Sequence, residues 1–183
     1  MVTKKAWLEA GLRMLAKEGY GALRIERLAG ALGVSKGSFY HHFSDGMPGF
    51  RRELLAHYEQ EHTQRHFDTV AAEDQTPADR LRLLRRLVMA NEDQEPRRGA
   101  NIRTWAAHDD DAQRTLERVD AARIEYLRAL WEAISGDAEA ATPMARLLYV
   151  MLIGAQHLLP PLEPSEIDQL YEVVLAAVLE DEP

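Results

Sequence analysis

The chain has 183 residues, which suits one compact domain or a small head joined to a larger body. It contains no cysteine, so disulfides, thiolate metal sites and thiol redox switches are excluded. The sequence has no apolar run of about 18 residues and opens on a charged amphipathic pattern. We therefore expect no membrane-spanning segment, no secretion signal and a cytoplasmic protein.

The charge is divided unevenly along the chain. The whole sequence carries a net charge of −8, which taken alone argues against a partner as acidic as nucleic acid. Residues 1–52, however, hold nine basic and four acidic side chains, a net of +5, which leaves −13 for the rest. The sequence therefore predicts a basic head on an acidic body, unless this clustering of surface charge is accidental.

Helical patterns run through the whole chain, and no alternating run of strand length occurs, so we expect an all-α fold. Thr3 is placed to cap a first helix, and Gly19 to end it. A second helix over 24–32 is followed by Gly33, whose backbone suits a sharp turn. A short third helix over 35–41 completes a helix-turn-helix head, which we place at residues 1–46.

The third helix is too short and polar to be stable alone, so Phe39 is expected to anchor it and leave its outer face free. Ser35 is the natural N-cap of this helix. The outer face offers hydrogen-bond donors, a tyrosine ring and a glycine: Lys36, Gly37, Ser38, Tyr40, His41 and His42. Such a helix fits the major groove of DNA. The alternative is an ordinary solvated turn beside a half-buried aromatic cluster.

The remaining residues, 47–183, form the predicted body and carry only helix punctuation. We expect about nine helices in all, with the body helices opening near residue 47, at Thr76, near Ile102, at Asp109–Asp111, at Thr142 and at Ser165. Breaks are expected at 96–99, at 135–136 and at 160–161.

The last two predicted helices are apolar over more than one face, so each must be covered on two sides. A second copy of the chain is the simplest cover, although a buried central pair in a monomer is the alternative. The interface candidates are Met151, Gly154, Ala155, Leu158, Leu170, Tyr171, Val174 and Val178. We therefore predict a homodimer.

Residues 1–50 resemble the DNA-binding domain of the TetR family of transcriptional regulators. The likeness rests on two blocks with the family's separation, Leu-Ala-Lys-Glu-Gly-Tyr at 15–20 and Leu-Ala-Gly-Ala-Leu-Gly-Val-Ser-Lys-Gly-Ser-Phe-Tyr-His-His-Phe at 28–43. The sequence departs from the family at Arg24, where a capping threonine or serine is usual, and at Gly46, near a usual lysine. Arg24 is expected to serve as a phosphate ligand, and Arg51 or Arg52 to supply the contact that Gly46 lacks.

The resemblance implies that Lys36, Ser38 and His41 contact bases or phosphates, and that Tyr40 and His42 contact the backbone of double-stranded DNA. It implies a palindromic operator bound by a dimer, and a small, mostly apolar effector that shifts the protein away from its DNA-binding state. Candidates for the effector pocket are Trp105, His108, Tyr126, Trp131, Met151 and His157. No cofactor and no metal are expected.

Two other functions stay open. A metal-binding helical enzyme or sensor would use His57, His62 and His66, of which the last two have a spacing of four residues on the predicted fourth helix. The sequence has no His-Glu-x-x-His order, catalytic triad pattern or phosphate loop, so we expect no enzyme. A non-specific DNA-binding protein is the other alternative.

Overall fold

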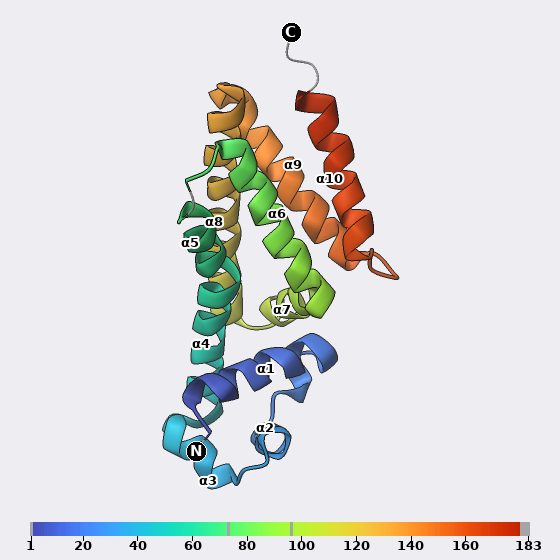
Figure 1. Cartoon of the computed structure of the whole chain (residues 1–183). Coiled ribbons are helices and arrows are strands. Elements are labelled where there is room, and N and C mark those ends of the chain that lie inside the picture. Colours follow the sequence, from blue (N-terminus) through green and yellow to red (C-terminus); the bar gives the residue numbers. More distant parts are fainter. Residues whose placement is uncertain (1, 73, 96, 180–183) are drawn as a thin grey trace. The chain divides into compact units, whose positions relative to one another are not determined.

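The structure, a computed structural model, describes residues 2–72, 74–95 and 97–179. The described residues form helices and no strand, as expected for an all-α fold (Figure 1). The helices are α1 (Lys4–Glu18), α2 (Ile25–Leu32), α3 (Lys36–His42), α4 (Gly46–Glu59), α5 (Arg65–Ala71), α6 (Pro77–Gln94), α7 (Arg98–Ala106), α8 (Asp110–Ser135), α9 (Ala138–His157) and α10 (Pro164–Leu179). A π-helical turn, Gln60–Gln64, joins α4 to α5. If α4, this turn and α5 are counted as one helix, the described residues form the nine helices expected.

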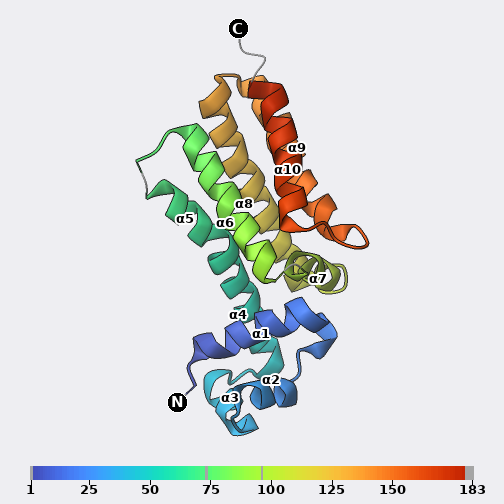
Figure 2. The same cartoon turned by 45° about the vertical axis from the view of Figure 1, so that its right-hand side comes forward.

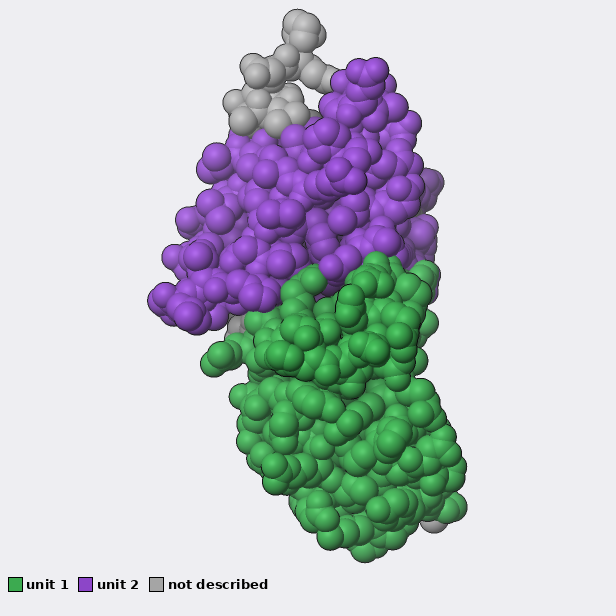
Figure 3. Space-filling model, turned by 180° about the vertical axis from the view of Figure 1, so that it is seen from behind, with its two compact units in different colours: residues 1–65, 97–119 green, residues 66–96, 120–183 purple. Residues whose placement is uncertain are grey.

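The chain divides into two compact units, which Figure 3 distinguishes by colour. Unit 1 comprises 1–65 and 97–119, and unit 2 comprises 66–96 and 120–183. Unit 1 therefore contains the predicted head together with α4, α7 and the first turns of α8. The functional boundary after residue 46 stays a prediction.

The predicted ends of the first two helices are confirmed. The Thr3 side chain accepts a hydrogen bond from the backbone N–H of Ala6 at 3.2 Å, which caps α1. Gly33 has φ 66° and ψ 31°, a left-handed conformation that only glycine adopts without strain, and it ends α2. The turn between α2 and α3 is thus specified locally by one residue.

Unit 1 is held together by an apolar core shared by α1, α4, α7 and the start of α8. Where α1 crosses α4, Gly11 lies so close to its neighbour that a Cβ atom there would be 2.7 Å from Cζ of Phe50. Behind α1, Tyr20 stacks on Trp105 with ring centroids 4.9 Å apart. Asn101 of α7 donates to the carbonyls of Leu15 and Ala16 at the end of α1, at 3.0 and 2.9 Å. These contacts fix the first helix, against which the rest of the head packs.

In unit 2, α6 and α9 both lie beside α10 (Figures 1 and 2). Met89, Leu152 and Ile167, one from each of these helices, meet in a buried apolar cluster. The Tyr171 hydroxyl donates to the carbonyl of Leu148 at 2.9 Å, which fastens α10 to α9. Burial raises the pKa of Tyr171 well above its usual value.

Arg85 of α6 adds a charged clamp to α10. Its Nε lies 3.0 Å from a carboxylate oxygen of Asp168, and its Nη2 pairs with Glu172. The Arg85 side chain is only 18% exposed, so this clamp is better shielded from water than the ion pairs of the surface. Packing and charge therefore both tie α6 to the last helix.

Three predicted helix starts are wrong. The helix expected near Ile102 begins at Arg98, inside the break expected at 96–99. The helix expected to open at Thr142 begins at Ala138, because the Asp137 carboxylate accepts from two backbone N–H groups, those of Glu139 and Ala140. Pro143 consequently lies inside α9. The last helix begins at Pro164, one residue before the expected cap at Ser165. The Thr76 cap of α6 and the start of α8 after Asp109 are confirmed.

Within the part of the chain that the structure describes, no helix is both long and apolar enough to cross a membrane.

Candidate nucleic-acid interface

The short helix α3 is anchored by one side chain. Phe39 is completely buried, and its ring meets those of Trp7, Phe43 and Phe50 at centroid distances of 5.4, 4.9 and 5.5 Å. These partners come from α1, from the end of α3 and from α4. Because α3 is too short to be stable alone, this aromatic cluster supplies the packing that holds it. The opposite face of α3 is left to solvent.

The exposed face carries the residues that the sequence singled out. Lys36, Gly37 and His41 are exposed, and the Tyr40 ring is 53% exposed. Ser38 is half-buried. A half-exposed tyrosine with its hydroxyl at the surface is suited to hydrogen bonding or stacking with an outside partner.

Gly37 has no evident role in the folding of the head. Its backbone φ lies outside the positive range, and a Cβ atom would lie 3.6 Å from Oγ of Ser35, an ordinary contact. A glycine inside a helix costs stability relative to alanine. No contact among the described residues explains its presence at the exposed start of α3. A binding partner that approaches the backbone closely at this point would explain it.

Gly46, in contrast, is required by the backbone. It has φ +65° at the first residue of α4, and a Cβ atom there would lie an ordinary 3.8 Å from Cε1 of Tyr40. A lysine at this position would be strained. The departure from the family pattern at residue 46 thus has a structural reason.

An acidic side chain that the sequence analysis missed lies beside the exposed face. Glu26 of α2 forms an ion pair with Lys36 of α3, and both side chains are about 60% exposed. The hydrogen bond from Lys36 lowers the pKa of the Glu26 carboxyl below its usual value. The helix pattern placed Glu26 on the polar face of α2 but gave no signal that it would meet Lys36 ten residues later.

His42 is tied to the N-terminal segment. Its Nε2 lies 2.9 Å from the carbonyl oxygen of Val2, so Nε2 must donate in this bond. Only Nδ1 is then left for a phosphate, and it can donate only when the ring is protonated. Since His41 is exposed and meets His42 edge-on at 5.2 Å, His41 is the more accessible of the two rings.

Side-chain capping is absent at the starts of α3 and α4, although Ser35 was expected to cap α3. Ser35 and Asp45 occupy the N-cap positions, but neither side chain makes a capping hydrogen bond. The Asp45 carboxylate instead pairs with Arg52 at 2.6 Å. The backbone N–H groups at the start of α3 therefore keep their capacity to bind an outside acceptor.

The three candidate phosphate ligands differ in their surroundings. Arg24 is exposed at the N-cap of α2, in extended backbone, and makes no side-chain cap. Arg51 lies over the ring of Tyr20, with its guanidinium carbon 4.8 Å from the centroid. Arg52 is exposed but paired with Asp45. Arg24 is therefore the least committed of the three within the described residues.

The six candidates for an effector pocket do not form one cluster. Trp105 and His108 belong to unit 1, where Trp105 is buried and His108 exposed. The other four belong to unit 2: Tyr126 half-buried, Trp131 buried, Met151 half-buried and His157 exposed. None of the six lines the hollow in unit 1 that is described below. Their role in a pocket stays a prediction.

An exposed apolar stripe runs along α9 and α10. On α9 it contains Leu147, Val150 and Gly154, with Leu158 directly after the helix, and on α10 it contains Leu170 and Val173. Met151, Tyr171 and Val174 are half-buried beside it, while Ala155 is buried in the core of unit 2. The side chain of Val178 lies outside the described residues. Spacings of three and four residues place each set on one face of its helix.

The histidines of the alternative metal hypothesis are scattered among other contacts. His62 stands in the π-helical turn with its ring 5.5 Å from that of Tyr58. His66 Nε2 lies 2.7 Å from Nδ2 of Asn91, and His57 is half-buried on α4. Among the residues described, no group of three or more histidines and carboxylates is arranged to hold a metal ion.

Comparisons with known proteins find a family model that matches the head and solved structures of similar fold. Residues 8–45 match the model of the bacterial regulatory proteins of the tetR family. A TetR transcription regulator from Haloarcula marismortui has a similar structure, with a TM-score of 0.66, 20% identity, and coverage of 97% of this chain and 87% of that one. A transcriptional regulator from Saccharomonospora viridis, solved with choline, gives a TM-score of 0.70 at 15% identity, with 94% of each chain covered. A search of curated proteins finds no match.

Proposed function

We propose that this chain, which belongs to the tetR family of bacterial regulatory proteins, binds a specific palindromic operator as a homodimer and leaves it when a small molecule binds. The observation that carries the proposal is the construction of α3. One buried ring, Phe39, holds a seven-residue helix whose other side is open and carries Lys36, Tyr40 and His41. The inner side of this helix belongs to the core, and its open outer side is suited to a binding partner.

In this proposal α3 lies in the major groove. Lys36, Ser38 and His41 contact base edges or phosphates, and Gly37 lets the backbone approach the duplex. The Ser35 hydroxyl and the backbone N–H groups of Lys36 and Gly37 donate to a phosphate oxygen at the start of the helix. Further positioning contacts come from Tyr40, His42 and Arg24.

The homodimer is proposed from the apolar stripe on α9 and α10. Val150 and Val173 are 64% and 68% exposed, and leaving several such side chains in water is unfavourable. Stripes on two adjacent helices suit the same two helices of a second copy related by a two-fold axis. The two α3 helices would then read the two halves of a palindrome.

The effector is proposed to be small and mostly apolar, and to act on unit 2. This unit contains the fully buried Trp131 and a stack of Tyr126 on Phe67 with centroids 4.1 Å apart, the kind of lining that apolar ligands use. A ligand that binds better to a conformation unable to hold DNA lowers operator affinity in proportion to that difference. The most consistent role is that of a non-enzymatic repressor.

The test is selection of bound fragments from genomic DNA by the full chain, followed by affinity measurements on an enriched fragment and a scrambled one. Lys36→Ala and Tyr40→Ala should abolish the preference and leave the sedimentation behaviour unchanged. Arg82→Ala, which removes an equally exposed cation from α6, serves as the matched control and should bind as the unmodified chain does. Enrichment no greater than for random DNA would refute a sequence-specific regulator and favour non-specific binding.

The dimer has its own test, because Val173→Glu places a charge in the middle of the stripe. We expect this variant to sediment as a monomer and to lose affinity for a full palindrome while it keeps weak binding to a half-site. A dimer that survives this substitution would place the interface elsewhere.

A further inference from the structure

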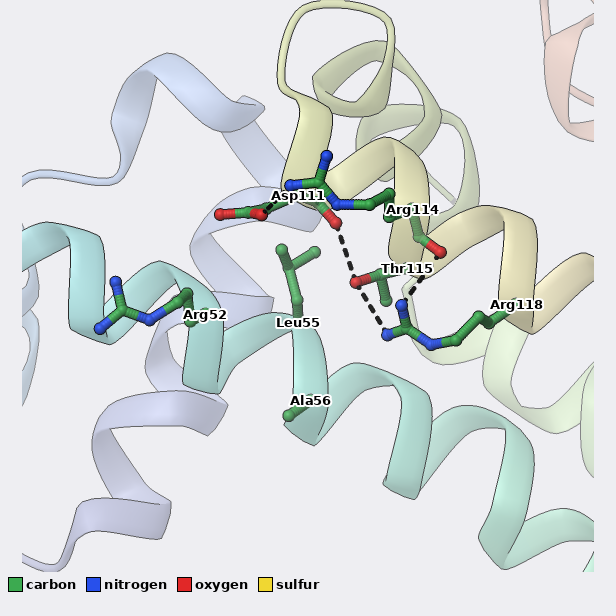
Figure 4. A pocket seen from close by; sticks show the side chains of 7 residues that line it. All are labelled: Arg52, Leu55, Ala56, Asp111, Arg114, Thr115 and Arg118. Atoms are coloured by element: carbon green, nitrogen blue, oxygen red, sulfur yellow. Dashed lines mark hydrogen bonds and ion pairs between the residues drawn. The ribbon is translucent and has the colours of Figure 1, made fainter.

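A hollow of about 190 Å³ lies in unit 1 between α4 and the first turns of α8 (Figure 4). It is lined on the α4 side by Arg52, Leu55 and Ala56, and on the α8 side by Asp111, Arg114, Thr115 and Arg118. Of its lining residues only Arg52 is also a candidate phosphate ligand, and none belongs to the predicted effector pocket. Its chemistry is also different, because three of its seven lining residues are arginines.

Two of the three guanidinium groups, those of Arg52 and Arg114, form only exposed ion pairs. Arg114 pairs with Asp111 one turn earlier on its own helix, and Arg52 pairs with Asp45. Side-chain exposure is 54% for Arg52 and 61% for Arg114, so both pairs lie in water, where such contacts contribute little. A guanidinium has five N–H donors, and each of these two pairs uses a single nitrogen. Both arginines can accommodate a further anion.

Arg118 is more firmly placed and shapes the rim of the hollow. Its Nη2 lies 2.9 Å from a carboxylate oxygen of Glu59, and its Nη1 donates to the carbonyl of Arg114 at 3.2 Å. The hydrogen bond that Arg118 donates to Glu59 raises the pKa of Arg118 above its usual value. The guanidinium thus stays charged and is oriented across the α8 side of the hollow by groups of both helices.

The floor of the hollow is apolar and small. Leu55 is 3% exposed and presents its side chain there beside the methyl group of Ala56. The hydroxyl of Thr115 donates to the carbonyl of Asp111 at 2.9 Å and accepts from Nη2 of Arg118 at 3.3 Å, so it has no proton left to give. Every polar group that remains available is therefore a donor or a cation, except the Asp111 carboxylate.

We propose that this hollow binds a small organic polyanion, with two or more negative charges on a short carbon skeleton, between Arg52 of α4 and Arg114 and Arg118 of α8. Phosphate esters and polycarboxylates share this chemistry: oxygen pairs that match guanidinium forks, and a few carbon atoms to cover Leu55 and Ala56. A long acyl chain does not fit a space of about 190 Å³.

Binding of an anion in the hollow would affect the head through Asp45. An anion that takes Arg52 competes with the Asp45 carboxylate, which stands at the N-cap of α4 in the turn between α3 and α4. Gly46, the next residue, lies against Tyr40 of α3. This coupling to DNA rests on the proposed function, whereas binding of the anion does not.

The experiment is calorimetric titration of the full chain, without DNA, with citrate, glycerol 3-phosphate, sulfate and chloride at equal ionic strength. We expect saturable binding of at least one organic anion at one site per chain, and at least about ten-fold weaker binding in Arg114→Gln, which removes one charge-assisted contact. Arg82→Gln is the matched control, because Arg82 pairs with Asp79 three residues away with nearly the same exposure. It should bind as the unmodified chain does.

Either of two results would overturn the proposal: no saturable heat with citrate or glycerol 3-phosphate, or equal weakening by Arg114→Gln and Arg82→Gln. Binding of sulfate as strong as that of both organic anions would also overturn it, because the site would then be a non-specific ion site. If Arg118→Gln instead flattens the salt dependence of DNA binding with no effect of any small anion, the hollow is part of the DNA surface. DNA binding that fails while the anion still binds would refute the proposed function alone.

Discussion

Substitution of Gly37 by alanine should separate folding from DNA binding. A Cβ atom at residue 37 meets only Oγ of Ser35 at 3.6 Å, and φ is not positive, so alanine fits the free protein without strain. Replacing a helical glycine with alanine under these conditions raises the free energy of unfolding by about 0.5–1 kcal/mol. If α3 approaches DNA through Gly37, the same methyl group should weaken operator binding by about ten-fold or more, which corresponds to about 1.4 kcal/mol.

Gly30→Ala is the matched control for this prediction. Gly30 is an exposed helical glycine on α2, with no atom within 4 Å of an added Cβ, so it should show the same gain in stability and no loss of DNA binding. Chemical denaturation gives the free energies of unfolding, and fluorescence anisotropy with an enriched operator gives the affinities. Full affinity in Gly37→Ala would refute the close approach of α3, and a destabilised Gly37→Ala would refute the reading of its surroundings.

Three other predictions concern the head and the surface charges. Glu26→Gln should release Lys36 for a phosphate and steepen the dependence of log K on log salt by about 0.9, measured by anisotropy; an unchanged slope would contradict this. Gly11→Ala should lower the free energy of unfolding, measured by urea denaturation, by about 1–3 kcal/mol, because the new Cβ would overlap Phe50. Unchanged stability would show that α1 and α4 can move apart at this position without cost. The carboxyls of Glu26 and Asp79 have lowered pKa values in the folded chain. Their contribution to stability is therefore present above pH about 4.5 and is lost as the pH falls through the pKa values of the folded chain. Denaturation midpoints measured across this range should decrease on acidification, and should decrease less in high salt.

The head could be predicted from the sequence because its signals are local. Gly33 adopts a left-handed backbone conformation that its own turn requires, and the Thr3 side chain accepts a hydrogen bond from the N–H group three residues later. Phe39 was assigned to the interior from the polarity of its neighbours alone, and it is completely buried. Each of these predictions depended on interactions within a few residues, which are the ones a sequence pattern records.

The start of α9 shows why a local signal can also mislead. Pro143 was taken as the first residue of a helix, where proline is favoured, but it is the sixth residue of α9 and forfeits a backbone hydrogen bond there. Asp137, which accepts two N–H bonds, offsets that loss and starts the helix earlier. The sequence held two competing start signals, and only their energies decide between them.

The charge partners within the site could not be predicted, because they join residues on different elements. Glu26 meets Lys36 only after Gly33 has turned α3 against α2, and Val2 reaches His42 across 40 residues. The sequence identified the residues of the outer face. It did not show that Lys36 forms an ion pair with Glu26, or that His42 donates to the carbonyl of Val2.

These partners change what the positive charge of the head means for DNA binding. Lys36 is already paired with Glu26, so in the proposed complex a phosphate would have to replace the carboxylate of Glu26, which would stay near the duplex as a negative charge. Non-specific DNA, which offers phosphates alone, gains little from this exchange. A duplex that also offers base contacts to α3 gains the additional energy that the exchange requires. In the proposed complex, the ion pair of Glu26 with Lys36 therefore reduces the gain from phosphate contacts, so that a larger share of the affinity must come from base contacts.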